Sequence, residues 1–430
     1  MMTHVIPSIA RKIRTSELEL MDYFDQLLST IHKREPGVMA FVDDGDFVER
    51  LHSDARIIID RYPLPEDRPP LFCIPFGVKD IFHVEGFSTR AGSQLPPERL
   101  TGNEANSVTR LKEAGGLVLA KTVTTEFAYF APGPTRNPHN PEHTPGGSSS
   151  GSAAAVGAGM VPLALGTQTI GSITRPAAFC GVVGYKPSYE RISREGVIPL
   201  SQSLDHIGCF TQDIASVELA ASILVQDWKS TKLDNRPILG IPEGPYLQRA
   251  TEEGSRHFHR TVEHLKEKGF IVRTVSVMED FENIVERHNQ ILAAESAQVH
   301  ALWFAAFGNK YHEKTAALIR RGQSISPEEL EGALEGREEL RRELTAAMDE
   351  AGIDLWISPA APGEAPRGLE STGDPVMNLP WTHSGLPTVN LPSGFSENGL
   401  PLGLQVAGGW YADEVLLSLA SGIEEALAED

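Results

Sequence analysis

The pattern of apolar and polar positions along the 430-residue chain begins with helical periodicity. Apolar residues recur at helical spacing over residues 20–31, and Ser16 followed three positions later by Glu19 has the form of a capping box. This pattern predicts an amphipathic helix that ends before Pro36. A second helix is expected over residues 47–62, where charged residues alternate with a periodic apolar face.

Beyond residue 70 the pattern changes to short apolar runs separated by glycine and proline, beginning with residues 72–78 and 117–120. A helix is expected between these two runs. The later strand candidates are residues 238–241, 271–277, 355–358, 388–391 and 402–406, alternating with helices near 255–268, 280–305, 328–350 and 412–427. This alternation predicts an α/β fold built on one extended sheet with helical layers.

The same pattern predicts one large domain over residues 1–430. A helical layer is expected over about 1–65, a core over about 70–215, and a C-terminal part over about 235–430 that completes the sheet. The polar stretch 229–237 is the one candidate for a junction, and we interpret it as a surface loop within the domain.

The composition of the chain limits the kinds of molecule that it is expected to bind. The chain is 40% hydrophobic and 22% charged, as in a globular protein, and its formal net charge is −20. That charge opposes broad binding to nucleic-acid phosphates or to anionic lipid surfaces. Small or neutral partners are therefore expected, with no nucleic acid and no membrane, and a homodimer is left open as the oligomeric state.

Cysteine usage and the N-terminal residues favour a cytoplasmic protein. Three cysteines cannot form a disulfide framework in a chain of this length, and the first 20 residues lack the apolar core of a signal peptide. The longest small and apolar stretch, residues 153–165, is interrupted by glycine and proline and is too short to span a bilayer.

Residues 145–181 are unusually rich in serine, glycine and alanine. A flexible linker would not contain the apolar run 153–165, which suits a tightly packed helix followed by a strand. The segment also lacks the lysine of a phosphate-binding loop. What remains is two serines preceded by glycine, Ser148 and Ser172, and glycine lets backbone amides approach a reacting carbonyl closely.

A serine hydroxyl needs a base to become a strong nucleophile. Lys79 is the candidate, because it ends the apolar, strand-like run that begins at Ile74. Burial there would lower the pKa of the lysine from about 10.4 toward neutrality, and a neutral amine can accept a proton.

These residues stand in motifs through which the chain resembles the amidase signature enzymes. The matching motifs are GVKD at 77–80, TRNPHNP at 135–141, PGGSSSGSAAAV from 145, GTQTIGSITRPAAFCG at 166–181 and GVVGYKPSYERISREGVIPL at 181–200. The resemblance implies an extended mixed sheet covered by helices on both sides. It also implies hydrolysis of a small-molecule amide without a cofactor or a metal.

The resemblance assigns a role to each of the three residues. Ser172 is expected to be the acylated nucleophile, Lys79 the general base and Ser148 the proton relay between them. The family places its two serines 24 positions apart, which selects Ser148 over Ser149 and Ser150.

Backbone features of the site are implied in the same way. The peptide bond between Gly147 and Ser148 is expected to be cis. The expected oxyanion hole consists of the backbone amides of Thr169, Ile170, Gly171 and Ser172.

The chain departs from the family pattern around the nucleophile. Most members read Gly-Thr-Asp-Thr-Gly-Gly-Ser-Ile-Arg, whereas this chain has Gln168, Ile170 and Thr174 at the Asp, second Gly and Arg positions. We interpret the loss of two opposite charges as replacement of an ion pair by neutral hydrogen bonds, with Arg175 taking over part of the arginine's role.

Further residues belong to the expected pocket or are assigned structural roles. The expected substrate-binding residues are Tyr129, Gly147, Met377 and Trp381, which favour an apolar or aromatic acyl group. His139 and His143 lie among prolines that exclude a metal-binding helix. Cys73, Cys180 and Cys209 are assigned to the core, and Asp80 and Asp205 are expected to orient loops.

Three alternatives to a simple amidase remain at this stage. The first is the A subunit of a glutamine-dependent tRNA amidotransferase, which the altered residues at 168 and 170 disfavour. The second is a hydrolase of a related C–N bond, in a carbamate, ureide or hydrazide. The third is a catalytically silent scaffold, which the presence of Lys79, Ser148 and Ser172 together disfavours.

Overall fold

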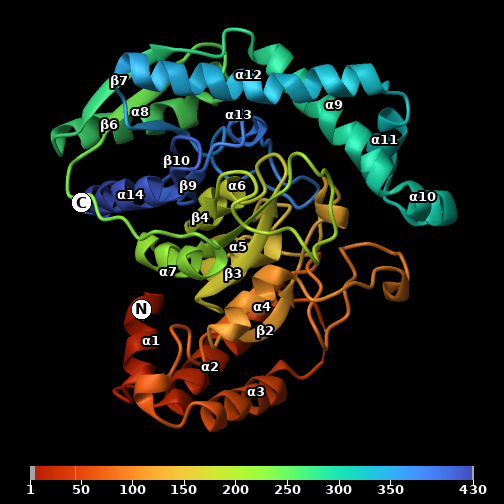
Figure 1. The fold of residues 1–430 in the computed structure, drawn as a ribbon, viewed down its shortest axis with the longest axis vertical. Helices are drawn as coiled ribbons and strands as arrows, with labels where there is room; N and C mark the ends of the chain where they lie inside the picture. The colour runs from red at the N-terminus through yellow and green to blue at the C-terminus, as the bar shows by residue number, and fades with distance from the viewer. Residues whose placement is uncertain (1–4, 44, 429–430) are drawn as a thin grey trace.

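The computed structural model describes residues 5–43 and 45–428, and one ten-stranded sheet runs through this part of the chain (Figure 1). Its strands are β1 (Pro75–Lys79), β2 (Leu117–Thr122), β3 (Leu163–Gln168), β4 (Val183–Lys186), β5 (His206–Thr211), β6 (Ile238–Glu243), β7 (Ile271–Ser276), β8 (Leu355–Pro359), β9 (Thr388–Phe395) and β10 (Pro401–Ala407). Their spatial order is β2-β1-β3-β5-β4-β9-β10-β8-β6-β7. Pairing is parallel at both ends of the sheet and antiparallel in its centre, so the predicted extended mixed sheet is confirmed.

Helices flank this sheet, as expected for an α/β domain (Figure 1). They are α1 (Ile6–Arg14), α2 (Leu20–Val38), α3 (Phe47–Arg61), α4 (Asn106–Glu113), α5 (Ser150–Gly157), α6 (Thr174–Cys180), α7 (Ile214–Leu224), α8 (Glu252–Glu267), α9 (Phe281–Val299), α10 (Ala301–Phe307), α11 (Glu313–Gly322), α12 (Pro327–Ala351), α13 (Leu379–His383) and α14 (Asp413–Ala428). α3 packs against β2 at one end of the sheet, and α12 packs against β7 at the other. No helix in the described ranges is long and apolar enough to cross a membrane.

The small-residue run after residue 149 forms the predicted packed helix and strand, α5 and β3. Every residue of β1 and β3 is buried, which explains why these strands are nearly continuous apolar runs. α5 packs against both strands. It can do so because its residues are small: a side chain at Gly151 would collide with the backbone of Ala40 and Val123.

The predicted start and end of the first long helix were wrong. Ser16 does not cap α2, because it adopts a left-handed conformation with φ 59° and its hydroxyl accepts a hydrogen bond from Arg68. α2 also continues past Pro36 to Val38. Its end is set by Met39, which is left-handed, and by Glu35, whose carboxylate accepts hydrogen bonds from the next two backbone N–H groups.

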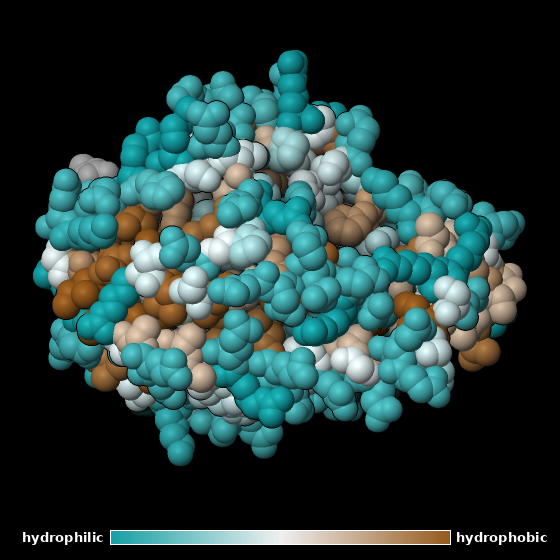
Figure 2. Space-filling model, turned by 90° about the horizontal axis from the view of Figure 1, so that it is seen from above, coloured by the Kyte–Doolittle hydropathy of each residue, from teal (hydrophilic) through white to brown (hydrophobic). Residues whose placement is uncertain are grey.

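Most other predicted elements are confirmed. The second helix, the five later strands and the helices near 255–268, 328–350 and 412–427 all occur. The helix expected over 280–305 is interrupted at His300 and forms α9 and α10. The face seen from above in Figure 2 is mainly hydrophilic, with smaller groups of apolar side chains between the polar ones.

Candidate active site

Lys79 ends β1 in the buried part of the sheet, between β2 and β3. Its side chain is fully buried, as the sequence predicted, and Nζ lies 2.7 Å from the hydroxyl of Ser148 and 2.7 Å from the hydroxyl of Thr167. Burial lowers the pKa of Lys79 well below its usual 10.5, although the carboxylate of Asp205 opposes this effect. The site therefore favours the neutral amine, the form that can accept a proton.

Ser148 is held by its neighbours immediately before α5. The peptide bond between Gly147 and Ser148 is cis, as the family resemblance implied. The carbonyl of Gly147 accepts a 2.6 Å hydrogen bond from Arg175, and the carbonyl of Ser148 accepts one from the Thr125 N–H. A side chain at Gly147 would come within 2.7 Å of Thr372, so this position has room only for glycine.

Ser172 lies on the turn between β3 and α6, and the residue is 7% exposed. Arg175 in the first turn of α6 donates to the Gly147 carbonyl, and this bond ties the helix that follows Ser172 to the residue before Ser148. Among the described residues, the Ser172 hydroxyl makes no hydrogen bond to Ser148. Catalytic hydrogen bonds often tighten only when substrate binds, so the lack of this bond is compatible with a nucleophile.

The backbone amides of residues 169–172, the predicted oxyanion hole, lie between β3 and α6. Within the described part of the chain, these four amides donate no hydrogen bond to protein atoms. Gly171 allows the Asn378 side chain to pack closely against the turn, since a side chain at residue 171 would overlap it. The four amides are thus without a protein acceptor in the described ranges, as the predicted oxyanion hole requires.

A buried network of neutral hydrogen bonds supports this turn. The Gln168 side-chain oxygen accepts from the N–H groups of Ile173 (2.7 Å) and Thr174 (3.0 Å) and from the Thr174 hydroxyl (3.2 Å). The Gln168 amide group donates to the hydroxyl of Thr382 on α13 (3.0 Å), and that hydroxyl donates to the carbonyl of Ile170 (2.6 Å). Neutral hydrogen bonds thus join the side chains at positions 168 and 174, as the sequence-based interpretation expected.

Arg175 supports the opposite side of the site. It is almost fully buried, and burial lowers its pKa to about 10. The guanidinium donates to Gly147 and to the hydroxyl of Thr372, and it makes no bond to Gln168. Arg175 thus steadies the backbone before Ser148, whereas the support of the nucleophile turn comes from Gln168 and Thr382.

The two aspartates orient backbone segments and side chains, as predicted. Asp205 accepts hydrogen bonds from the Thr169 hydroxyl (2.6 Å) and from the N–H groups of Leu200 and Ser201. Asp80 forms a buried ion pair of 2.8 Å with Lys121. Asp205 therefore links the nucleophile turn to the loop that follows residue 198.

Three of the expected substrate-binding residues belong to one apolar cluster with Ile170. Met377 and Trp381 are fully buried, and the Trp381 indole donates to the hydroxyl of Tyr246. Tyr129 is only partly buried at the edge of this cluster. The cluster packs behind the nucleophile turn, and Tyr129 is its more accessible member.

Other candidates for chemistry have structural roles. His139 and His143 lie in a loop, where their rings bond to the carbonyls of Cys180 and Ala365. The thiols of all three cysteines are buried, which raises their pKa and disfavours the reactive thiolate.

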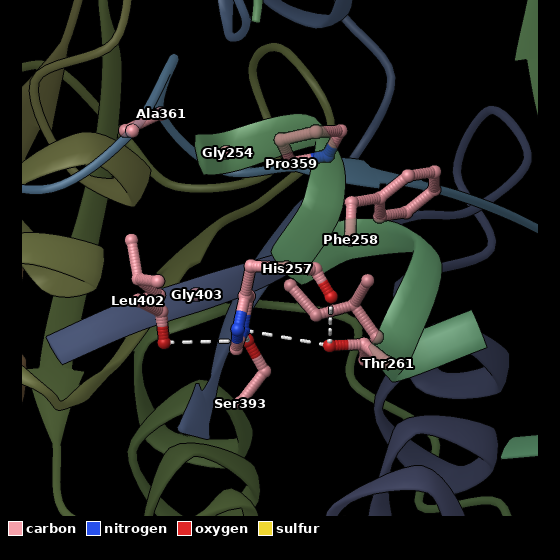
Figure 3. Close-up of a pocket in the computed structure, with 11 residues that line it drawn as sticks. Gly254, His257, Phe258, Thr261, Pro359, Ala361, Ser393, Leu402 and Gly403 are labelled. Atoms are coloured by element: carbon pink, nitrogen blue, oxygen red, sulfur yellow. Dashed lines mark hydrogen bonds between the residues drawn. The ribbon is translucent and has the colours of Figure 1, made fainter. Parts of the chain in front are cut away.

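Outside this site, a serine and a histidine lie close together between α8 and the strands β9 and β10 (Figure 3). The Nε2 atom of His257 lies 2.9 Å from the hydroxyl of Ser393. The cavity beside them has a volume of only about 10 Å³, roughly enough for one water molecule. This pair has no room for a substrate, so the site around Lys79 is the candidate active site.

Comparison with known proteins agrees with this fold. The family described as Amidase matches residues 45–417. The chain is 30% identical to the A subunit of the glutamyl-tRNA(Gln) amidotransferase of Synechococcus sp. (strain WH7803), over 97% of this chain and 96% of that protein. It is 31% identical to the protein in "Crystal structure of amidase", with a TM-score of 0.87 over 97% of this chain and 98% of that one.

A third similar protein comes from a structure described as "An unexpected vestigial protein complex reveals the evolutionary origins of an s-triazine catabolic enzyme". It is 26% identical, with a TM-score of 0.84 over 98% of both chains. Together with the match over residues 45–417, these similarities establish that the chain belongs to the amidase signature family.

Sequence reasoning missed two hydroxyl groups of the site, those of Thr167 and Thr382. Thr167 holds the lysine, and Thr382 holds the nucleophile turn. Thr167 lies inside the motif at 166–181, and its place near the end of a strand was a usable signal. Thr382 had no such signal, because it lies 214 positions from Gln168.

Proposed function

We propose that the protein is an amidohydrolase that cleaves a carboxylic amide into an acid and ammonia or an amine through an acyl-enzyme on Ser172. The observation that carries this proposal is the fully buried Lys79, 2.7 Å from Ser148 and with a lowered pKa. Perturbed lysines of this kind act as general bases. Amide C–N chemistry is the chemistry of the family to which the chain belongs.

In the acylation step, the Ser172 oxygen bonds to the substrate carbonyl carbon. Its proton passes to Ser148, whose own proton passes to Lys79. The carbonyl oxygen becomes an anion, which the amides of residues 169–172 would hold, and each such donor contributes about 3 kcal/mol. The C–N bond then breaks, and the nitrogen takes the proton back from Lys79 through Ser148. Water hydrolyses the ester by the same proton path.

The leading alternative is the A subunit of a glutamine-dependent amidotransferase, because a similar protein carries that name. Gln168 and Ile170 in the nucleophile turn weigh against it. Hydrolysis of a carbamate, ureide or hydrazide would use the same three residues. A silent scaffold would have no need for a buried lysine, because desolvation of its amine destabilises the folded protein.

A substrate screen of the purified full chain tests the proposal. Primary amides, anilides, hydrazides, ureides and carbamates with aliphatic or aromatic acyl groups would be incubated with the protein, and ammonia or amine release measured. We expect at least one amide to be hydrolysed by the chain alone. Turnover of glutamine that requires the other components of an amidotransferase would instead identify the amidotransferase alternative. Loss of both turnover and covalent labelling would identify a scaffold.

Substitution Thr382→Val tests the support of the nucleophile turn. Valine has a similar shape but cannot donate to the Ile170 carbonyl or accept from Gln168. Small displacements of catalytic groups cost up to about 10²-fold, so we expect kcat to fall roughly 10- to 100-fold with KM little changed. Thr382→Ser keeps the hydroxyl and should restore most of the loss. Equal losses in both variants would show that packing, not hydrogen bonding, matters at residue 382.

A further inference from the structure

We propose that a cavity beside Lys79 binds the leaving-group side of the substrate, and that the enzyme therefore prefers amides whose nitrogen carries a neutral apolar substituent. This inference rests on the proposed function and specifies its substrate class. The cavity has a volume of about 210 Å³. Its inner wall includes Thr167, whose hydroxyl lies 2.7 Å from the lysine Nζ, and Asp205.

The cavity extends from the surface to Thr167, whose hydroxyl bonds to Lys79. Gln202 at its outer end is exposed, and Arg194 and Val197 are partly buried. Thr167 and Asp205 at its inner end are buried. A group bound in the cavity would thus reach within one residue of Lys79 while its far end points toward solvent.

The chemistry of the reaction decides which half of the substrate this cavity can hold. The leaving nitrogen must take its proton from Ser148, which receives it from Lys79, so the nitrogen lies on the relay side of the scissile bond. The carbonyl oxygen faces the amides of the turn at residues 169–172. The cavity borders Thr167, the hydrogen-bond partner of the lysine, so we place it on the side of the nitrogen and not of the acyl carbon.

The walls of the cavity define the chemical class of the substituent. Most of the wall is apolar, and the residues responsible are Ile81, Ala128, Val197, Ile198, Leu200 and Ile207. The Arg194 guanidinium at the outer end disfavours an ammonium group, and the Asp205 carboxylate at the inner end already accepts hydrogen bonds from Thr169, Leu200 and Ser201. A volume of about 210 Å³ is below the roughly 300 to 1,000 Å³ of sites for drug-sized ligands. A short alkyl chain or a single ring suits this space.

A series of amides with one acyl group tests the proposal. Primary, N-methyl, N-propyl, N-butyl and N-benzyl amides of phenylacetic acid and of hexanoic acid would be compared by kcat/KM. Simple alkylamines have nearly equal basicity, so differences from N-methyl to N-butyl report binding of the chain. We expect kcat/KM to rise at least about 10-fold from N-methyl to N-butyl, as for apolar groups in apolar pockets. An N-(2-aminoethyl) amide, which carries a charge, should gain nothing.

Two variants of Val197 connect this preference to the cavity. Val197 lines the cavity and is partly buried, so the loop that carries it can accept a change of size. Val197→Phe should reduce the kcat/KM of the N-butyl amide relative to the N-methyl amide at least 10-fold. Val197→Ala should shift the preferred substituent toward N-benzyl. Labelling of Ser172 by a fluorophosphonate should persist in both variants, which shows that each variant folds.

The outcomes separate this inference from the proposed function. Hydrolysis of primary amides without any gain from N-methyl to N-butyl would overturn the inference and leave the amidohydrolase assignment intact. An N-butyl advantage that Val197→Phe does not reduce would also overturn it, because the substituent would then bind elsewhere. Loss of all turnover and labelling in the unaltered protein would overturn the proposed function itself.

Discussion

Replacement of Ser172 by alanine should reduce amide turnover by about 10⁶-fold, the loss seen when a triad hydrolase loses its nucleophile. The reason is that no acyl-enzyme can form without the serine oxygen. Covalent labelling by a fluorophosphonate should disappear as well, since that reagent reports the same oxygen. Both can be measured on the purified protein, by product release and by intact mass.

A matched control is available in Ser393, which pairs with His257 in Figure 3 and has no room for a substrate beside it. Ser393→Ala should keep both turnover and labelling. The Ser172→Ala protein should unfold at nearly the wild-type temperature, because the Ser172 hydroxyl is small and makes no hydrogen bond to Ser148 among the described residues. Full labelling of Ser172→Ala, or loss of labelling in Ser393→Ala, would show that the nucleophile is a residue other than Ser172.

Much of the fold could be predicted because its strands are bounded by glycine and proline. The strands from β6 to β10, apart from the second half of β9, were found in this way. β4 and β5 were missed, since both are short, fully buried and mixed in composition, so neither shows a period of two. The end of α2 was misplaced because side-chain bonds of Glu35 to the following backbone outweigh the effect of Pro36.

The site likewise contains some residues that local sequence motifs identify and others that only the fold brings together. Lys79, Ser148 and Ser172 stand in motifs whose spacing can be counted along the chain. The groups that support them come from far away in sequence: Thr372 lies 197 positions from Arg175. A single sequence contains no measure of such contacts, so the supporting network became visible only in the fold.

Replacement of Lys79 by methionine should reduce kcat/KM by about 10²- to 10⁴-fold, the usual contribution of a general base. The same variant should be more stable than the unaltered protein at pH 7, because the fully buried amine loses hydration on folding. Each unit by which folding lowers a pKa corresponds to about 1.4 kcal/mol. Activity can be measured with the amide found in the screen, and stability by urea unfolding.

The expected stability difference between Lys79→Met and the unaltered protein depends on pH. The pKa of Lys79 is lower in the folded protein than in the unfolded chain, so between these two values the unfolded chain binds more protons and stability rises with pH. Lys79→Met lacks this dependence, and its advantage should narrow as the pH approaches 10.5. In the unaltered protein, kcat/KM should fall as the pH drops below the lowered pKa, where Lys79 is protonated and cannot act as a base.

A second buried lysine provides the contrast that makes the result specific. Lys121 is also fully buried, but it forms an ion pair of 2.8 Å with Asp80. Lys121→Met would remove the lysine from this buried ion pair and should destabilise the protein by about 3 to 5 kcal/mol. If Lys79→Met were destabilised to a similar extent, Lys79 would be charged in the folded protein, and the neutral-base mechanism would fail. A gain in stability together with a loss of turnover is the result that the buried, neutral amine requires.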